Sequence, residues 1–250
     1  MKFNIKTNYV TFLGIKQAII SDMRKCNIYR DVCLDKPFIP INIQIFVTTR
    51  KGSKAMYDVL NRSEVKPGAQ EKWGKIFEIT DLQWKKIYSI PFFTTNSAKL
   101  QWLQYRINHN ILTTNSIMFK IGKVDSKLCN LCHSEEETIC HLMWNCPTVQ
   151  QLLNNFRNLC QMKNIYIELN QDTFLFGEYK TKENIRQSNV IFMLVKQYIY
   201  RSRCFKSNLS VLGVLHEIES YIKAIKYTAG VENKMNEFNN RWEIWQHLFT

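Results

Sequence analysis

A mainly α-helical fold that carries one small zinc-knuckle-like element is the fold class that this sequence predicts. Most segments after residue 69 repeat apolar residues at helical spacing, whereas strand-like alternation is confined to the stretch before it. Four of the eight cysteines fall within the eighteen residues from Cys129 to Cys146. The 250 residues suit one or two domains with a sizeable core, and the 13% aromatic content excludes a disordered chain.

The N-terminal segment, residues 1–68, is predicted to contain short strands. One short strand is expected over residues 9–15. A second, half-buried strand is predicted over residues 36–47, because β-branched residues alternate there with other types. A Pro-Gly pair at 67–68 predicts a turn and therefore the boundary of this segment.

The helical region that follows, residues 69–160, is predicted to hold two helices ahead of the cysteines. Thr80 and Asp81 are expected to cap a helix that Pro91 breaks. Ser97 is the expected N-cap of a helix over residues 98–108. Its apolar residues recur at three to four positions and predict a buried stripe, formed by Leu100, Leu103, Ile107 and Ile111, while Trp102, Tyr105 and Arg106 face elsewhere.

The remaining helices complete this region and a C-terminal helical region, residues 161–250. Helices are expected over residues 149–162, 184–205, 209–227 and 235–249. Gly230 is the predicted end of the third of these. Trp242, Trp245 and Phe249 are the predicted packing face of the last one.

The charge balance is strongly positive, with 34 Lys and Arg against 21 Asp and Glu, or +13 overall. Such a balance favours polyanionic partners, of which nucleic acid is the commonest, although a ribosome-like or membrane-surface role has the same sign. The longest apolar run, 190–195, is far shorter than the ~20 residues that a membrane helix needs. With no secretory signal visible either, we expect an intracellular protein of the nucleus or cytoplasm, no membrane contact, and reduced or metal-bound cysteines.

The most informative motif is Cys129-x2-Cys132-x8-His141-x4-Cys146. Three thiolates and one imidazole form a closed four-ligand set that suits a structural Zn²⁺ ion. Free buried thiols beside a surface histidine are the alternative interpretation. His133 and Cys140 are possible substitute ligands, and at most one of the adjacent Cys140 and His141 is expected to bind the metal.

The residues around this motif resemble the zinc-binding tail of non-LTR (LINE-type) retrotransposon reverse transcriptases. In that family two cysteines precede a Glu-Thr-x-x-His-Leu core and a final cysteine, and Glu137, Thr138, His141, Leu142 and Cys146 occupy those places here. Softer matches extend the resemblance over about residues 50–250. They are the stretches 84–93, 99–115, 174–177 and 200–203.

The resemblance implies a tail that helps to hold template RNA or target DNA during target-primed reverse transcription. It also implies that the N-terminal segment is a remnant of the junction after a polymerase. In this chain zinc is expected to fix a local fold while basic helices beside it contact phosphates through their Lys and Arg side chains. The acidic run 135–137 is expected to be a solvated face.

Two groups of residues are candidates for contact with the phosphate backbone of RNA or DNA. One precedes the cysteines, and the other is a Lys/Tyr/Arg face predicted on the helix over residues 184–205, where a solvated amphipathic helix is the alternative. The candidates are Lys99, Arg106, Lys120, Lys123 and Lys127, and then Lys196, Tyr200, Arg201 and Arg203.

No catalytic activity is expected of this chain by itself. A polymerase needs clustered carboxylates for two metal ions, and the chain contains no Asp-Asp pair. A nucleic-acid-binding accessory domain is therefore the leading hypothesis. The alternatives are a zinc-stabilised helical module that docks a protein partner and an inactive fragment of a decayed element.

Overall fold

The computed structural model describes residues 66–179 and 186–249, together with positions 17 and 21. By internal contacts the chain divides into residues 1–66 and 67–250. Both strands predicted before residue 68 lie outside the described residues. In the described part the structure is helical, with a single isolated antiparallel bridge between Leu128 and Glu136. The mainly α class is therefore confirmed for this part of the chain.

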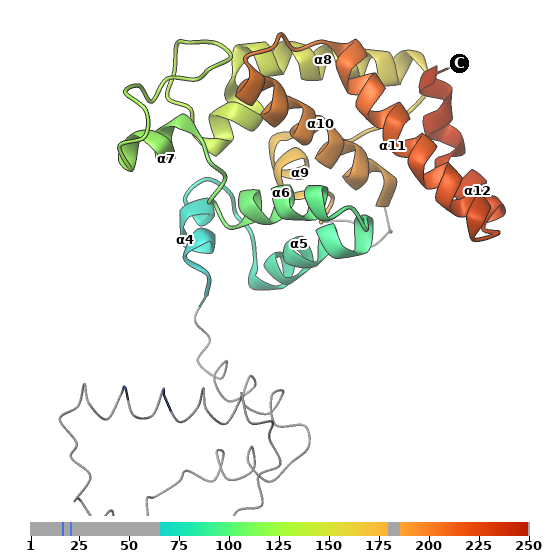
Figure 1. Cartoon of the computed structure of the whole chain (residues 1–250), viewed down its shortest axis with the longest axis horizontal. Coiled ribbons are helices and arrows are strands. Elements are labelled where there is room, and N and C mark those ends of the chain that lie inside the picture. The colour runs from blue at the N-terminus through green and yellow to red at the C-terminus, as the bar shows by residue number, and fades with distance from the viewer. Residues whose placement is uncertain (1–16, 18–20, 22–65, 180–185, 250) are drawn as a thin grey trace, which may run out of the picture. The chain divides into compact units, whose positions relative to one another are not determined.

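The described elements form a bundle around one long helix, α10 (Figure 1). Helix α10 packs against α5, α6 and α11, and α11 packs against α12. The metal-binding loop connects α7 to η1, a π-helical turn, while η2 is a 3-10 turn. The elements are α4 (Gly68–Gly74), α5 (Asp81–Thr94), α6 (Ala98–Asn108), α7 (Asn115–Lys120), η1 (His141–Asn145), α8 (Pro147–Met162), α9 (Gln171–Phe176), α10 (Arg186–Phe205), α11 (Val211–Val231), α12 (Met235–Gln246) and η2 (His247–Phe249).

Helix α10 is the centre of the hydrophobic core. Nine consecutive residues, 188–196, are buried, so this stretch of the helix is covered on every side rather than along one stripe. Beside it an aromatic cluster closes the core, with Trp73, Phe77 and Trp84 all in ring contact with Phe176 of α9. A helix in this position cannot keep a broad solvated face along its whole length.

Helix α5 begins where the sequence predicts but does not break at Pro91. Thr80 accepts a hydrogen bond from the Gln83 amide, and the Gln83 side chain bonds back to the Thr80 amide in a capping box. Pro91 lies inside the helix, which continues to Thr94. A proline removes the amide that would bond the carbonyl four residues earlier, but Asn108 of α6 donates to that Ile87 carbonyl at 3.3 Å. The predicted break was therefore wrong, because a neighbouring helix supplies the missing donor.

The limits and faces of three other helices correct smaller predictions. Ile111 is 51% exposed and Leu112 is buried instead, because α6 ends at Asn108 and the chain turns through Asn110 with positive φ. Helix α11 continues past Gly230, and Asn233 takes the left-handed position after its end. In η2 the 3-10 geometry buries Leu248 and leaves Phe249 37% exposed.

Candidate metal centre and nucleic-acid interface

The cysteine motif folds into a compact loop that brings four metal-ligating side chains together. The His133 amide donates to the Cys129 carbonyl, and His133 adopts φ 57°, which closes the turn after the first two cysteines. The π-helical turn η1 then joins His141 to the last cysteine, since the Cys146 amide donates to the His141 carbonyl at 2.8 Å. A π turn places residues five positions apart on the same side, which is the spacing of these two ligands.

The four ligand atoms have the separations of a tetrahedral zinc site. The Cys129 and Cys146 sulfurs lie 4.0 Å apart, and the Cys132 sulfur lies 3.3 Å from His141 Nε2. All four ligand atoms fall within 4.8 Å of one another. Zinc bonds of about 2.3 Å to sulfur and 2.0 Å to nitrogen would separate ligand atoms by about 3.5–3.8 Å in a tetrahedron. The residues therefore fit a closed structural zinc site, and the predicted set of Cys129, Cys132, His141 and Cys146 is the one the fold assembles.

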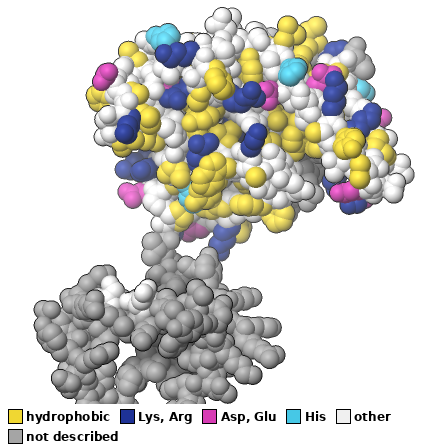
Figure 2. Space-filling model, viewed as in Figure 1, with side chains coloured by type: hydrophobic (Ala, Val, Ile, Leu, Met, Phe, Trp, Pro, Cys, Tyr) yellow, Lys and Arg dark blue, Asp and Glu magenta, His cyan; other side chains and the backbone are white. Residues whose placement is uncertain are grey.

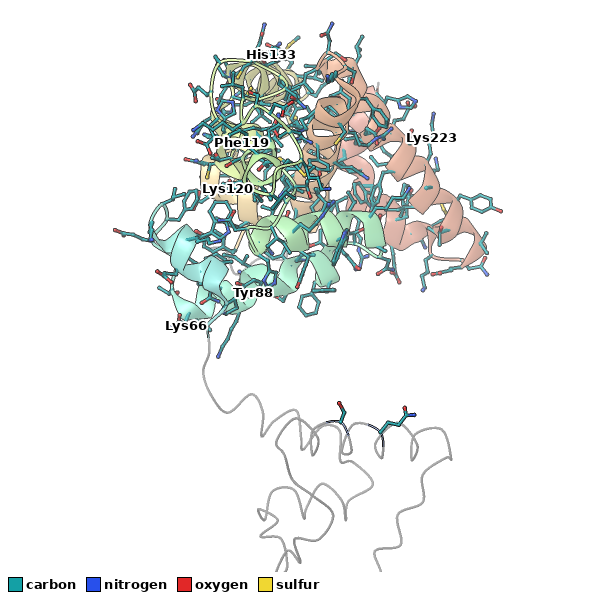
Figure 3. All side chains as sticks on the ribbon, turned by 60° about the vertical axis from the view of Figure 1, so that its left-hand side comes forward. Lys66, Tyr88, Phe119, Lys120, His133 and Lys223 are labelled. Carbon is teal, nitrogen blue, oxygen red and sulfur yellow. The ribbon has the colours of Figure 1, made fainter. Side chains whose placement is uncertain are left out.

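Neither substitute ligand belongs to this cluster. His133 is exposed, and Figure 3 shows it at the outer end of the loop region. Cys140 is half-buried and outside the four, and burial raises the pKa of its thiol to about 11.

Further contacts prepare the ligands for a metal ion. His141 Nδ1 lies 3.0 Å from a Glu135 carboxylate oxygen, which leaves Nε2 facing the sulfurs. Burial lowers the pKa of His141, but its hydrogen bond to Cys132 and the nearby charges, Glu135 among them, outweigh that effect and raise it. The bond from Cys129 and the backbone amides at the start of α8 lower the pKa of Cys146 to about 5, while the same bond and burial raise the pKa of Cys129.

The third acidic residue of the loop, Glu137, is completely buried. One carboxylate oxygen accepts from the Asn115 amide at 2.8 Å and from Arg203 Nε at 2.8 Å. The other accepts from the Asn130 amide at 3.0 Å, between the first two cysteine ligands. The expectation of a solvated acidic run was therefore wrong for Glu137, which fastens the metal-binding loop to α7 and α10. The Glu135 side chain is 63% exposed, although its carboxylate contacts His141.

Asn115 and Arg203 complete this network. Arg203 Nη2 lies 2.6 Å from both Glu137 and the Asn115 side-chain oxygen, and Asn115 in turn donates to the Leu128 carbonyl at 2.6 Å. Sequence reasoning missed Asn115 and this role of Glu137. The one available signal was the place of Glu137 in the Glu-Thr-x-x-His-Leu pattern.

The family comparison agrees with this geometry. Residues 53–152 match the family model described as zinc-binding in reverse transcriptase. This part of the chain is therefore similar to the zinc-binding domain of reverse transcriptases, and Cys129, Cys132, His141 and Cys146 are positioned to hold the zinc ion of such a domain. Neither the curated proteins nor the solved structures provide a match to the chain.

The predicted Lys/Tyr/Arg face of α10 is not a solvent-facing surface. Lys196 is 1% exposed, with its ammonium group bonded to the Gln104 side chain and the Leu175 carbonyl. Arg203 is 8% exposed and paired with Glu137. Tyr200 is half-buried, and its hydroxyl donates to the Thr113 carbonyl at 3.2 Å. The prediction that Lys196 and Arg203 face a nucleic acid was wrong, because neighbouring elements cover both of them; Arg201 is exposed and paired with Glu217.

Most of the predicted phosphate-contacting residues that precede the cysteines are exposed, unlike those of α10. Lys99, Lys120 and Lys123 are exposed, Lys127 is exposed and paired with Glu136, and Arg106 is half-buried. In Figure 3 Phe119 and Lys120 lie on the opposite side of the view from Lys223 of α11. Figure 2 shows Lys and Arg side chains interspersed with hydrophobic ones over the middle of one face, with acidic side chains mostly towards its edges.

A segment free of acidic residues runs through this part of the molecule. Residues 82–124 contain no Asp or Glu and six Lys or Arg, namely Lys85, Lys86, Lys99, Arg106, Lys120 and Lys123. The segment covers most of α5 and all of α6 and α7. This segment therefore carries six positive charges and no negative ones.

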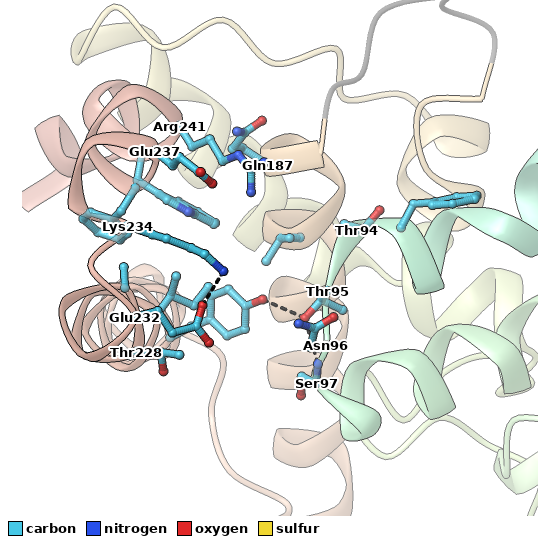
Figure 4. A pocket seen from close by; sticks show the side chains of 17 residues that line it. Thr94, Thr95, Asn96, Ser97, Gln187, Thr228, Glu232, Lys234, Glu237 and Arg241 are labelled. Carbon is cyan, nitrogen blue, oxygen red and sulfur yellow. Dashed lines mark hydrogen bonds and ion pairs between the residues drawn. The ribbon is translucent and has the colours of Figure 1, made fainter.

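A cavity of about 440 Å³ lies between the end of α5, the start of α10 and helices α11 and α12 (Figure 4). Thr95 and Tyr221 share a 2.6 Å hydrogen bond in it, and Lys234 pairs with Glu232 at 2.8 Å. Two acidic and two basic side chains line the cavity, so its charge is balanced. Among the described residues, no helix has the length and apolar character to cross a membrane.

Proposed function

We propose that this chain is a nucleic-acid-binding accessory region of a reverse-transcriptase-type protein, resembling the part downstream of the polymerase in non-LTR retrotransposon proteins. Its partners are RNA, DNA or both, held through the phosphate backbone, and the chain carries out no catalysis by itself. Zinc acts as a structural ion that fixes the loop between α7 and α8. Exposed lysines of α6, α7 and the loop after α7 contact phosphates.

The observation that carries the proposal is the acid-free segment that leads into the zinc loop. Lys99, Lys120 and Lys123 are exposed within it, and none of them belongs to an ion pair between described residues, although the charge of Lys120 acts on Glu136. The zinc loop follows α7 directly, and the Glu137 network holds Asn115, the first residue of that helix. A zinc-fixed loop that holds the start of α7 positions Lys120 and Lys123 together, while Lys99 is positioned by α6.

A salt titration of binding tests this proposal. The purified chain is titrated with a fluorescent oligonucleotide, RNA or DNA, over a series of salt concentrations. Replacing Lys99, Lys120 and Lys123 together by Gln is expected to reduce the slope of log affinity against log salt by roughly 2–3, since each lost phosphate contact removes about 0.7–0.9.

The matched control removes the same charge from another side of the molecule. Lys223, Lys226 and Arg241 are exposed on α11 and α12, and their replacement by Gln is expected to leave the slope nearly unchanged. Affinity that does not depend on salt, or equal losses in the two triple variants, would contradict the proposal.

A further inference from the structure

One side of α6 presents aromatic and basic side chains together. Trp102, Tyr105 and His109, the residue after the helix end, recur at helical spacing on the side away from the buried Leu100, and Lys99 lies one turn before Trp102. Trp102 is 57% exposed and Tyr105 is 37% exposed. A tryptophan is the largest apolar side chain, and leaving most of it in water is unfavourable unless a partner covers it.

The rings on this side are already stacked. The Trp102 and Tyr105 rings lie 5.3 Å apart with an interplanar angle of 7°. Tyr105 contacts the His109 ring at 4.2 Å, and His109 stacks on Tyr88 of α5 at 5.1 Å and 26°. The array joins two helices and holds Trp102 in place without covering it, so little side-chain entropy remains to be lost on binding.

Arg106 supports the same surface from beside the rings. Its guanidinium carbon lies 6.0 Å from the Trp102 ring centre and 5.5 Å from that of Tyr200. Among the described residues its Nε is the buried side-chain polar atom that has no hydrogen-bond partner. Because this Nε is enclosed by protein, an anionic ligand would meet the outer part of the half-buried guanidinium, which the rings hold in place.

The charge around the rings identifies the partner. No acidic residue occurs between positions 82 and 124, while Lys99 and Arg106 lie on α6 itself. A protein partner would require only the apolar rings, but the acid-free segment that carries them favours a polyanion. Aromatic rings can stack on a polyanion only if the polyanion exposes flat faces of its own. Bases of a single strand expose such faces, whereas a duplex hides them in its stack.

We propose that Trp102 and Tyr105 form a stacking platform for the bases of single-stranded nucleic acid, with Lys99 and Arg106 contacting the adjacent phosphates. The inference deepens the proposed function and depends on it. The side of α6 from Lys99 to His109 is roughly 15 Å long at 1.5 Å per residue, enough for a few nucleotides. Stacking of this kind tolerates any base, so the platform distinguishes strand state rather than sequence.

The test compares a dT12 single strand with a hairpin duplex of mixed sequence. Trp102→Ala is expected to weaken binding to dT12 roughly tenfold, and to change duplex affinity less than twofold. Trp102→Phe keeps a ring and is expected to retain most of the affinity. The salt dependence of all three proteins is expected to be the same, because no charge is removed.

Two controls keep the outcome interpretable. Leu82→Ala removes another exposed apolar side chain, 78% exposed on α5, and is expected to bind dT12 as the wild type does. Tyr105→Leu disrupts the same stack through a second residue, and is expected to reproduce the loss of Trp102→Ala. Thermal melting of each variant verifies that it is folded.

The failure of this inference differs from failure of the proposed function. If Trp102→Ala binds dT12 like the wild type while the triple lysine variant is weakened, the platform is wrong and phosphate binding stands. Equal losses on dT12 and duplex would also overturn the platform. If the wild type binds neither strand form, the proposed function itself is wrong.

Discussion

Helices α6 and α10 carry similar combinations of Lys, Arg and aromatic residues, yet the fold uses them in opposite ways. On α6 the stripe containing Lys99, Trp102 and Tyr105 remains exposed. On α10 the corresponding Lys196 and Arg203 are buried beneath neighbouring elements. Helical spacing identifies which side chains share a face, but it does not tell how many faces the rest of the protein covers.

The buried cations of α10 have structural partners. Lys196 is held by two oxygens, and burial lowers its pKa to about 7. Burial also lowers the pKa of Arg203, but its hydrogen bond and charge interaction with Glu137 outweigh this effect and raise it. Arg203 therefore remains charged and supports the zinc loop, while the cations of α6 remain available to a ligand. In this account the buried cations of α10 are structural, whereas the cations of α6 are available to a ligand. Zinc removal and three single substitutions test this difference between the two helices.

Removal of zinc is expected to have the largest effect. Binding of a structural zinc ion is worth on the order of 10 kcal/mol in small zinc domains, so chelation should unfold residues 126–147. Because Glu137 loses its fixed position, the end of α10 around Arg203 should lose protection as well, while α6 keeps it. Hydrogen exchange by mass spectrometry measures this, with zinc-reloaded protein as the control. If α6 loses its protection from hydrogen exchange before the end of α10 does, then α10 is not the helix that supports the zinc loop, and the account is contradicted.

Arg203→Met comes next. It leaves the Glu137 carboxylate buried without its cation, which is expected to lower the free energy of unfolding by about 3–5 kcal/mol in urea denaturation. Adding Glu137→Gln removes the unpaired charge, so the double variant should lose less than the sum of the two single losses. A loss below about 1 kcal/mol, typical of an exposed ion pair, would show that Arg203 is not structural.

Lys196→Met is expected to change how stability depends on pH. The folded-state pKa of Lys196 is about 7 and its ordinary value is 10.5, so between these values the unfolded chain binds a proton that the folded chain does not. Stability therefore rises with pH over this window, by up to roughly 3 kcal/mol between pH 7 and 9.5. The variant should lack this rise in denaturation curves, and its oligonucleotide affinity should keep the salt slope of the wild type. A reduced salt slope in the variant would show that Lys196 contacts phosphates, which would contradict its structural role.

Arg201→Gln is expected to have the smallest effect on stability. Arg201 is exposed, and its pair with Glu217 of α11 lies 2.6 Å apart at the surface. Exposed pairs of this kind contribute at most about 1 kcal/mol. Urea denaturation should therefore distinguish Arg201→Gln clearly from Arg203→Met, although the two arginines are separated by one residue.

Much of the fold could be predicted because it depends on local sequence. The helix over residues 98–108 and the capping box at Thr80 follow from spacing and short-range hydrogen bonds. The metal centre could be predicted for the same reason, since all four ligands lie within one short loop. The exposed lysines of α6 and α7 could be predicted as well, because lysine is rarely buried without a partner.

The errors arise where a distant residue decides the outcome. Pro91 is accommodated because Asn108 bonds the carbonyl that the proline leaves free. Glu137 is buried because Arg203, 66 positions later, neutralises it. Lys196 is buried because Gln104, 92 positions earlier, accepts its hydrogen bond. None of these pairings has a signal in the periodicity of a single helix.

Crosslinking to a single strand tests the division between the two helices most directly. A thymine-rich oligonucleotide carrying 5-iodouracil is irradiated on the bound chain, and trypsin then releases one α6 peptide, 100–106, and one α10 peptide, 197–201. Crosslinks at Trp102 or Tyr105 in peptide 100–106, with none at Tyr200, are the predicted result. Crosslinks concentrated in peptide 197–201 would contradict it.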